Sequence, residues 1–259
     1  MKETAFFNCL QGQKALEELT EEPYASIICY PRSSKPEIEK RLQELRKIGI
    51  TAVEFAGDKQ VFNAAILGKG YVGVVVLAYR KGERAALKIR RIDADRSGMQ
   101  HEAEMLRKAN RVNVGPRLFC TSDNFLLTEF VDGMLLPKWL DIHMRKVEVR
   151  KILRRILEQC WRLDNANLDH GELSHAPKHV IIDEGGLPFL VDFETASAKR
   201  HPSNVTSICQ FLFIGSETAK KIAELLGKKD KKLIVEALRR YKNTRTRENF
   251  ARVLKACSV

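Results

Sequence analysis

Residues 68 to 75 read Gly-Lys-Gly-Tyr-Val-Gly-Val-Val, and they decide the fold that this sequence is expected to adopt. The three glycines have the spacing of loops that hold nucleotide phosphates. In dinucleotide-binding folds such a loop opens a helix, but residues 74–79 are apolar and rich in β-branched side chains, as in a strand. We therefore predict a loop that joins two strands, with a plain glycine-rich hairpin as the alternative.

A second strand, with a lysine near its end, follows this loop. Lys81-Gly82 is a natural hairpin turn between the two strands, which predicts an antiparallel sheet. In Ala85-Ala-Leu-Lys88 the lysine ends an apolar run, so its charge needs an anion, and phosphate oxygens would supply one. A helix is predicted over residues 99–109, where Glu102 has the spacing to pair with Lys88, whereas Glu104 is expected to face solvent.

The glycine-rich loop, the strand lysine and the helix glutamate, in this order, resemble the N-terminal lobe of protein kinases. Residues 125–133 are similar to the kinase hinge, which implies that Thr128 is the gatekeeper. The run from Ala86 to Arg96 is similar to a family of predicted archaeal serine/threonine kinases. The resemblance covers residues 61 to 200 and is weaker for the residues before them.

The resemblance also implies which residues bind ATP. The glycine-rich loop and Lys88 would hold the phosphates, and Val75 and Ala86 would cover the adenine ring. Backbone groups of Glu129 and Val131 would meet the edge of the adenine. The whole implied set is Gly68, Lys69, Gly70, Gly73, Val75, Ala86, Lys88, Thr128, Glu129, Val131 and Lys178. The expected cofactors are therefore ATP and Mg²⁺, with Mn²⁺ as the alternative metal.

An α+β, protein-kinase-like fold of two lobes follows from this resemblance. The expected domains are a small α/β extension at residues 1–60, a β-rich N-lobe at residues 61–132 and a helical C-lobe at residues 133–259. In the extension, strands at residues 25–30 and 52–55 would flank a helix at residues 36–48. The C-lobe would be helical apart from short strands at residues 180–182 and 189–191.

The segment from His170 to Ile182 carries the expected catalytic carboxylate, which would act with Lys88 and Glu102. Its beginning, His170-Gly-Glu172, resembles the H-G-D form of RIO-like and aminoglycoside-type kinases, with Glu172 in place of Asp. A glutamate can take the proton of an acceptor hydroxyl if the backbone retreats slightly. His179 stands seven positions after Glu172, whereas the kinase motif has its metal-binding Asn five positions after the Asp. Two residues are inserted, and the Asn is missing.

The metal ligands are predicted at Asp192 and His179. Asp192-Phe-Glu194 stands where kinases have D-F-G, whose Asp binds metal; an ordinary turn aspartate is the alternative. Histidine suits Mn²⁺ better than Mg²⁺, which prefers oxygen ligands. Lys178 or His179 could instead neutralise phosphate charge or be structural, and Glu194 could assist the metal or stiffen the turn.

Composition limits the partners and the compartment without identifying either. Lys and Arg outnumber Asp and Glu by 45 to 33, and the net charge of +12 favours polyanions, including RNA or a ribonucleoprotein; an ordinary solvated surface is the alternative. No run approaches the roughly 18 apolar residues that span a membrane, and residues 1–10 lack a signal-peptide profile. The six cysteines form no C-x-x-C pair, so we expect reduced thiols in a cytoplasmic protein with no membrane partner.

These features together predict an ATP-dependent phosphotransferase. We expect an atypical serine/threonine protein kinase, or a RIO-like kinase or ATPase, that transfers the γ-phosphoryl group to a hydroxyl of an unknown protein or small molecule. The segment after Asp192 is short and lacks an A-P-E motif, which is similar to RIO-type kinases and to the small kinase of the KEOPS complex. The alternative is a nucleotide-binding pseudokinase scaffold, which could dock RNA or a ribonucleoprotein.

Overall fold

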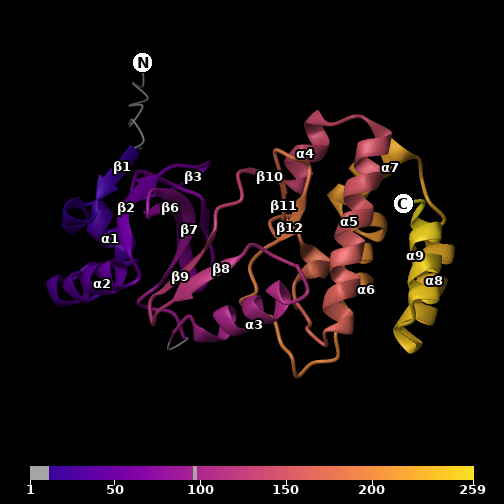
Figure 1. Cartoon of the computed structure of the whole chain (residues 1–259). Helices are drawn as coiled ribbons and strands as arrows, with labels where there is room; N and C mark the ends of the chain where they lie inside the picture. Colours follow the sequence, from indigo (N-terminus) through magenta and orange to yellow (C-terminus); the bar gives the residue numbers. More distant parts are fainter. Residues whose placement is uncertain (1–11, 96–97) are drawn as a thin grey trace, which may run out of the picture. The chain divides into compact units, whose positions relative to one another are not determined.

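The protein has a mixed α+β architecture, with a sheet-rich N-terminal part and a helical C-terminal part (Figure 1). The computed structural model describes residues 12–95 and 98–259. Internal contacts divide the chain into a sheet unit, Met1–Ala103 with Arg117–Phe130, and a helical unit, Glu104–Pro116 with Val131–Val259. Three expectations fall on residues outside the described ones: the signal-peptide reading of residues 1–10, the reduced thiol of Cys9, and the end of the family resemblance at Arg96.

An antiparallel sheet organises the sheet unit. Its strands, in spatial order, are β1 (Gly12–Ala15), β2 (Ile50–Phe55), β6 (Gly73–Arg80), β7 (Glu83–Arg90), β9 (Phe125–Glu129) and β8 (Leu118–Thr121), and β5 (Gly68–Lys69) also pairs with β6. A small separate hairpin is formed by β3 (Lys59–Val61) and β4 (Ala64–Ile66). The predicted hairpin is confirmed, because β6 and β7 meet at Lys81-Gly82, where both φ angles are positive, as a tight turn requires. The glycine-rich loop joins two strands, also as predicted.

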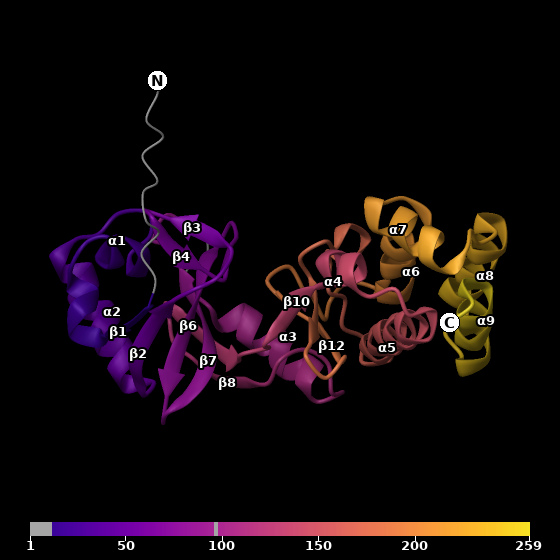
Figure 2. The same ribbon diagram turned by 90° about the horizontal axis from the view of Figure 1, so that it is seen from above.

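Residues before the glycine-rich loop form a layer against this sheet (Figure 2). The layer contains η1 (Leu16–Thr20), α1 (Tyr24–Ile28) and α2 (Lys35–Lys47). The helix predicted at residues 36–48 and the strand predicted at residues 52–55 are confirmed as α2 and β2. The strand predicted at residues 25–30 is wrong, because these residues form α1 and a turn. Such a short apolar run does not distinguish a strand from one buried turn of helix.

Arg41 ties this layer to the sheet. Its side chain is fully buried and donates hydrogen bonds to Ile28 O at 2.7 Å, to Arg90 O at 2.6 Å and to Asn124 Oδ1 at 3.1 Å. A buried guanidinium is stable only when its donors are satisfied in this way. Residues 12–60 therefore share one sheet and one core with the strands of the expected N-lobe.

The two faces of the sheet have different environments. Side chains alternate along each strand, and directly paired residues share a face. Val74, Val76 and Leu87 are fully buried in the core that contains α1 and α2. Val75 and Lys88 pair with each other on the other face, which we call the lysine face.

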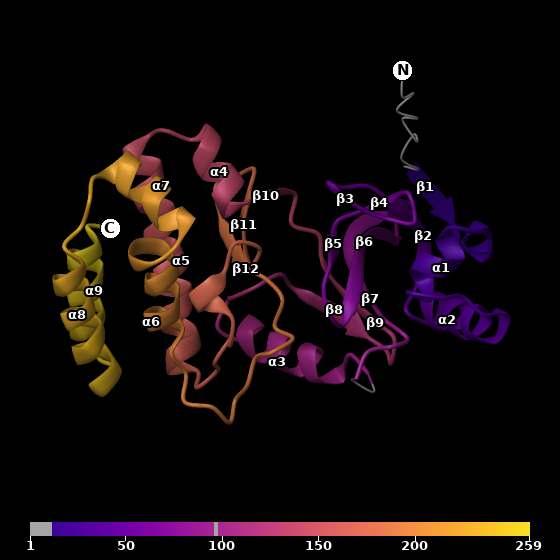
Figure 3. The same ribbon diagram turned by 180° about the vertical axis from the view of Figure 1, so that it is seen from behind.

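Helices dominate the helical unit (Figure 3). They are α4 (Leu136–Ile142), α5 (Lys146–Asn165), η2 (Leu173–His175), α6 (Asn204–Cys209), η3 (Gln210–Ile214), α7 (Glu217–Leu226), α8 (Lys231–Asn243) and α9 (Arg247–Cys257). A three-stranded sheet has the order β10 (Gly133–Leu135), β11 (Val180–Asp183) and β12 (Pro188–Leu190), so the two short predicted strands are confirmed. The helix α3 (Gln100–Asn110) contains the boundary between the units and confirms the helix predicted at residues 99–109.

The described residues contain no helix that is both long and apolar enough to cross a bilayer. Among these residues the five cysteines are free thiols, and all except Cys120 are buried. Burial raises the pKa of Cys160 and Cys209, so these thiols are poor nucleophiles at neutral pH.

Candidate functional site

Lys88 and Glu102 form a buried ion pair in the sheet unit. Lys88 Nζ lies 2.8 Å from Glu102 Oε2 and 3.0 Å from Oε1, and the side chains are 10% and 6% exposed. Lys88 comes from β7, and Glu102 comes from the first turn of α3. The partner predicted from spacing is therefore confirmed. Glu104, two residues further along α3, is 57% exposed and pairs with Lys108, as expected of a solvent-facing residue.

The lysine face brings most of the predicted nucleotide-binding residues together. Strand register places Gly68 opposite Val75, Val75 opposite Lys88, and Ala86 opposite Thr128. All of these residues share one face because paired residues on antiparallel strands point the same way. Val75 and Ala86 are only half-buried, so this part of the face offers apolar surface to a flat ligand.

The glycine-rich loop closes tightly. Gly70 N–H donates to Gly73 O at 2.8 Å, and Leu67 N–H donates to Val75 O at 2.9 Å. A Cβ on Gly73 would lie 2.7 Å from Ile89 O, closer than real Cβ atoms approach a carbonyl, so the backbone needs glycine there.

Lys69 lies apart from the other predicted ligands in the loop. It pairs with Val74, so its side chain is on the face opposite to Lys88. Its ammonium group lies 4.7 Å from the centre of the Tyr30 ring. The predicted ligands Val131 and Lys178 belong to the helical unit, where Lys178 is exposed. The Glu129 N–H donates to Arg117 O within the sheet unit, and the Glu129 carbonyl accepts from the Thr128 hydroxyl at 3.3 Å.

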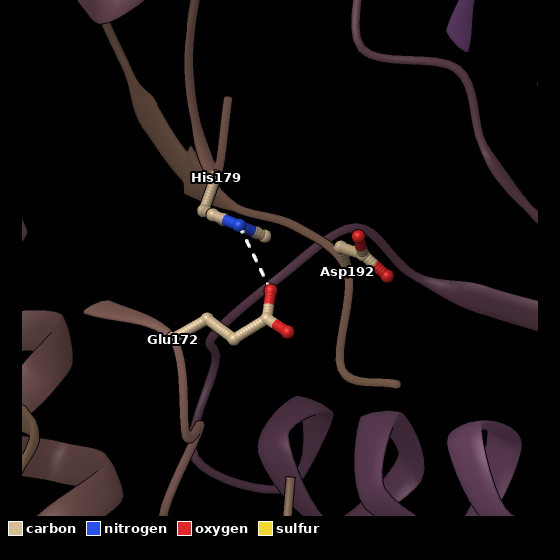
Figure 4. Close-up of side chains that lie close together, drawn as sticks. All are labelled: Glu172, His179 and Asp192. Atoms are coloured by element: carbon tan, nitrogen blue, oxygen red, sulfur yellow. Dashed lines mark ion pairs between the residues drawn. The ribbon is translucent and has the colours of Figure 1, made fainter. Parts of the chain in front are cut away.

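Three predicted residues converge in the helical unit. Glu172, His179 and Asp192 each offer a ligand atom, and these atoms all lie within 4.8 Å of one another. We call them the Glu-His-Asp cluster (Figure 4). His179 Nε2 lies 3.0 Å from Glu172 Oε2. Glu172 precedes η2, His179 precedes β11 and Asp192 follows β12, so a turn and a hairpin position the cluster.

His179 is 4% exposed, and its Nδ1 atom is buried without a hydrogen-bond partner among the described residues. The imidazole contacts Glu172 through Nε2, and its ring meets the His170 ring edge-on at 5.6 Å between ring centres. Asp192 has a φ of 70°, which is uncommon for any residue except glycine and which Asp tolerates better than most. Such local strain is characteristic of functional sites, where the surrounding structure maintains it.

This donor set fits a divalent cation. Two carboxylates supply the hard oxygen ligands that Mg²⁺ and Mn²⁺ share, and both residues are partly accessible. The imidazole shifts the preference toward Mn²⁺.

The backbone before Glu172 is anchored by residues that the motifs do not include. His170 N–H donates to Asn204 Oδ1 at 2.8 Å, and the His170 ring lies 3.1 Å from Val191 O and 4.9 Å from the Phe193 ring. Burial, together with the neighbouring His179, lowers the pKa of His170 to about 4. His170 is therefore a neutral structural residue at physiological pH.

Asp164 fixes Asn204 in turn. Asp164 Oδ1 accepts from Asn204 N and Nδ2, both at 2.8 Å, and Oδ2 accepts from Val205 N at 3.2 Å and from the Tyr241 hydroxyl at 2.9 Å. Burial raises the pKa of Asp164, while these donors favour its ionised form. The sequence did not point to Asp164 or Asn204, because neither belongs to a motif.

A cavity of about 400 Å³ also lies in the helical unit. Met134, Trp139 and Ile152 contribute apolar surface to it, and Glu148, Lys151 and Arg155 contribute charged groups. None of the predicted site residues lines it.

Comparison with known proteins adds one distant relative. No protein-family model matches the chain. The uncharacterized protein MJ1211 of Methanocaldococcus jannaschii is 29% identical over 116 residues, which cover 44% of this chain and 97% of the relative. Its name assigns no activity, so the kinase resemblance and the roles of the site residues stay predictions.

Proposed function

We propose that this chain is an ATP-dependent phosphotransferase with a kinase-like, two-lobed arrangement, acting as an atypical serine/threonine kinase. The observation that carries the proposal is the buried Lys88–Glu102 pair, which lies on the same face of the sheet as the glycine-rich loop, Val75 and Ala86. A lysine fixed by a buried carboxylate beside a tight glycine-rich loop suits the binding of phosphate groups.

The residues that carry this proposal have distinct roles. Lys88, oriented by Glu102, would pair with phosphate oxygens, and Val75 and Ala86 would contact the adenine. Asp192, with His179 or Glu172, would hold the divalent ion that neutralises the phosphates. Glu172 would accept the proton as the acceptor oxygen bonds to the γ-phosphorus and the bond from that phosphorus to the leaving ADP oxygen breaks.

The contact between His179 and Glu172 supports the assignment of Glu172. The 3.0 Å contact with the imidazole orients the longer glutamate side chain and offsets the extra rotatable bond that it has compared with Asp. In this proposal the two inserted residues place His179 where it restrains the catalytic carboxylate.

Labelled ATP tests the proposal directly. The protein is incubated with γ-labelled ATP and either Mg²⁺ or Mn²⁺, and transfer of label to protein, small hydroxyl compounds or water is measured. Lys88→Ala, Glu172→Ala and Asp192→Ala should each reduce turnover by at least about 100-fold, the scale of removing one key electrostatic group. Glu104→Gln is the control and should retain full turnover. Turnover that persists in all three variants would contradict the enzymatic proposal.

A pseudokinase scaffold is the second candidate. It is favoured by the missing Asn and by the engagement of Glu172 with His179. Nucleotide binding without turnover in the same experiment would support it.

RNA is the proposed partner for either candidate. Residues 217–259 carry thirteen Lys and Arg against five Asp and Glu, so they contribute +8 of the net charge of +12. Lys232, Arg239 and Lys242 are exposed on α8, and no carboxylate among the described residues lies within ion-pair distance of them. Binding should weaken steeply with salt, because each phosphate contact releases counterions. Affinity for RNA that is insensitive to salt, or no affinity, would exclude this partner.

A further inference from the structure

Tyr30 contacts both ends of the glycine-rich loop through two cations. Lys69 Nζ lies 4.7 Å from the centre of the Tyr30 ring, and Arg91 Cζ lies 4.9 Å from it. Lys69 is in β5, where the loop begins. Arg91 N–H donates to Val72 O at 2.8 Å, so Arg91 also holds the returning side of the loop.

The position of Tyr30 is itself fixed. Tyr30 O accepts from Ile92 N–H at 2.8 Å, its ring lies 5.6 Å from the Phe62 ring, and it packs against the core that contains α1 and α2. Arg91 is held by two hydrogen bonds to Asp93, at 2.8 and 2.7 Å. The ring therefore connects the buried N-terminal layer to a loop whose own contacts are mostly backbone hydrogen bonds.

We propose that Tyr30 is a positioning residue that holds the glycine-rich loop in its phosphate-binding conformation, and that Lys69 anchors the loop to Tyr30 instead of binding phosphate. This inference rests on the proposed function. Strand register is the main argument, because Lys69 is on the face opposite to Lys88 and Val75. A cation over an aromatic ring at this distance is a stabilising contact. Residues 12–60, which contain no catalytic motif, thereby acquire a role in nucleotide binding.

Mg-ATP affinity of a variant series tests this role. A cation–π contact at a partly exposed site contributes about 0.5–1 kcal/mol, or roughly a two- to fivefold change in affinity. Tyr30→Leu removes two contacts, together about 1–2 kcal/mol, and should raise the Kd for Mg-ATP by about five- to thirtyfold. Tyr30→Phe keeps the ring and should stay close to wild type. Tyr24→Leu is the matched control, because Lys14 lies 5.4 Å from the Tyr24 ring but neither residue is in the loop.

A double-mutant cycle separates anchoring from direct phosphate binding. If Lys69 acts through Tyr30, Lys69→Met should weaken Mg-ATP binding about two- to fivefold in the wild type and have no further effect in Tyr30→Leu. If Lys69 binds phosphate itself, Lys69→Met should cost the same factor in both backgrounds, and that result would overturn the inference. An unchanged Kd in Tyr30→Leu would overturn it as well.

Hydrogen exchange measured without nucleotide distinguishes failure of the anchoring role of Tyr30 from failure of the proposed function. The Gly70 amide, which donates to Gly73 O, should exchange faster in Tyr30→Leu than in the wild type or in Tyr24→Leu. Equal exchange rates would overturn the anchoring role whatever the nucleotide data. Absence of Mg-ATP binding by the wild type, or equal binding by Lys88→Ala, would instead overturn the proposed function and the nucleotide-binding role of Tyr30 with it.

Discussion

The lysine face and the Glu-His-Asp cluster each hold a glutamate, but they restrain it differently. Glu102 is 6% exposed and meets Lys88 through both carboxylate oxygens. Glu172 is 38% exposed and meets the buried imidazole of His179 through one. The first arrangement fixes a charged pair, whereas the second restrains a carboxylate that stays accessible. The comparison indicates a rigid element in the sheet unit, the Lys88–Glu102 pair, and an adjustable element in the helical unit, the Glu-His-Asp cluster.

The largest effect is expected from breaking the rigid element. Lys88→Met removes the cation beside the buried Glu102 carboxylate, and loss of one member of a buried pair costs about 3–5 kcal/mol. The free energy of unfolding, measured by urea titration at pH 7, should fall by this amount. The double variant Lys88→Met/Glu102→Leu should recover much of the loss, since neither charge of the pair remains. A double variant less stable than the single one would show that the two residues are not energetically coupled.

Acid should destabilise the helical unit by protonating His170, a fully buried residue beside the Glu-His-Asp cluster. The folded-state pKa of about 4 lies below the ordinary value near 6.5, so the stabilising contribution is complete above pH 6.5 and is lost as the pH falls through 4. In metal-free buffer this residue should account for roughly 3 kcal/mol of lost unfolding free energy between these values. Burial raises the pKa of Asp164, so this residue changes the unfolding free energy with pH in the opposite direction. Its contribution is the same in the wild type and in the histidine variants described next.

Comparison of two histidine variants isolates this effect. His170→Leu should flatten the dependence of unfolding free energy on pH between 6.5 and 4. The control variant His175→Leu changes an exposed histidine and should have the same slope as the wild type. Equal slopes in all three proteins would mean that His170 is not neutral in the folded state.

Sequence analysis was accurate where local pattern determines structure. The runs at residues 74–79 and 84–89 form the two predicted antiparallel strands, with the predicted turn at Lys81-Gly82 between them. Glu102 was identified because one turn of helix separates it from the apolar pair at Met105 and Leu106, and both of these are buried. The same method failed at residues 25–30, where a short apolar run carried no periodicity able to distinguish α1 from a strand.

The contacts of the Glu-His-Asp cluster depend on geometry that spacing does not encode. The sequence predicted neither the contact between Glu172 and His179 nor the short helix η2 that lies between them in the chain. The anchor from Asn204 to His170 joins residues 34 apart, and the bond from Asp164 to Asn204 joins residues 40 apart. Neither partner belongs to a local motif, so only the folded chain identifies them.

Changing the imidazole back to an amide sharpens the comparison between the two elements. His179→Asn introduces the residue type that binds metal in kinases and frees Glu172 from its restraint. The preference for Mn²⁺ over Mg²⁺, measured as the ratio of nucleotide affinities in the two ions, should fall by about tenfold, the lower end of effects seen for altered metal-site shells. The adjacent, exposed Lys178→Asn variant is the control and should keep the ratio. A ratio unaffected by His179→Asn would remove His179 from the metal site.

The smallest effect on unfolding free energy is expected at Glu104. Comparing it with Glu102 tests whether the buried and the exposed glutamate of α3 differ in their contribution. The pair of Glu104 with Lys108 is exposed and spaced by four residues, and such pairs contribute about 0.3–0.5 kcal/mol. Glu104→Gln should therefore lower the unfolding free energy by no more than that and leave the Kd for Mg-ATP unchanged. Glu102→Gln, the same change two residues earlier, should weaken both, because it removes the charge that fixes Lys88. Similar losses in the two variants would mean that the buried pair is not the element that organises the lysine face.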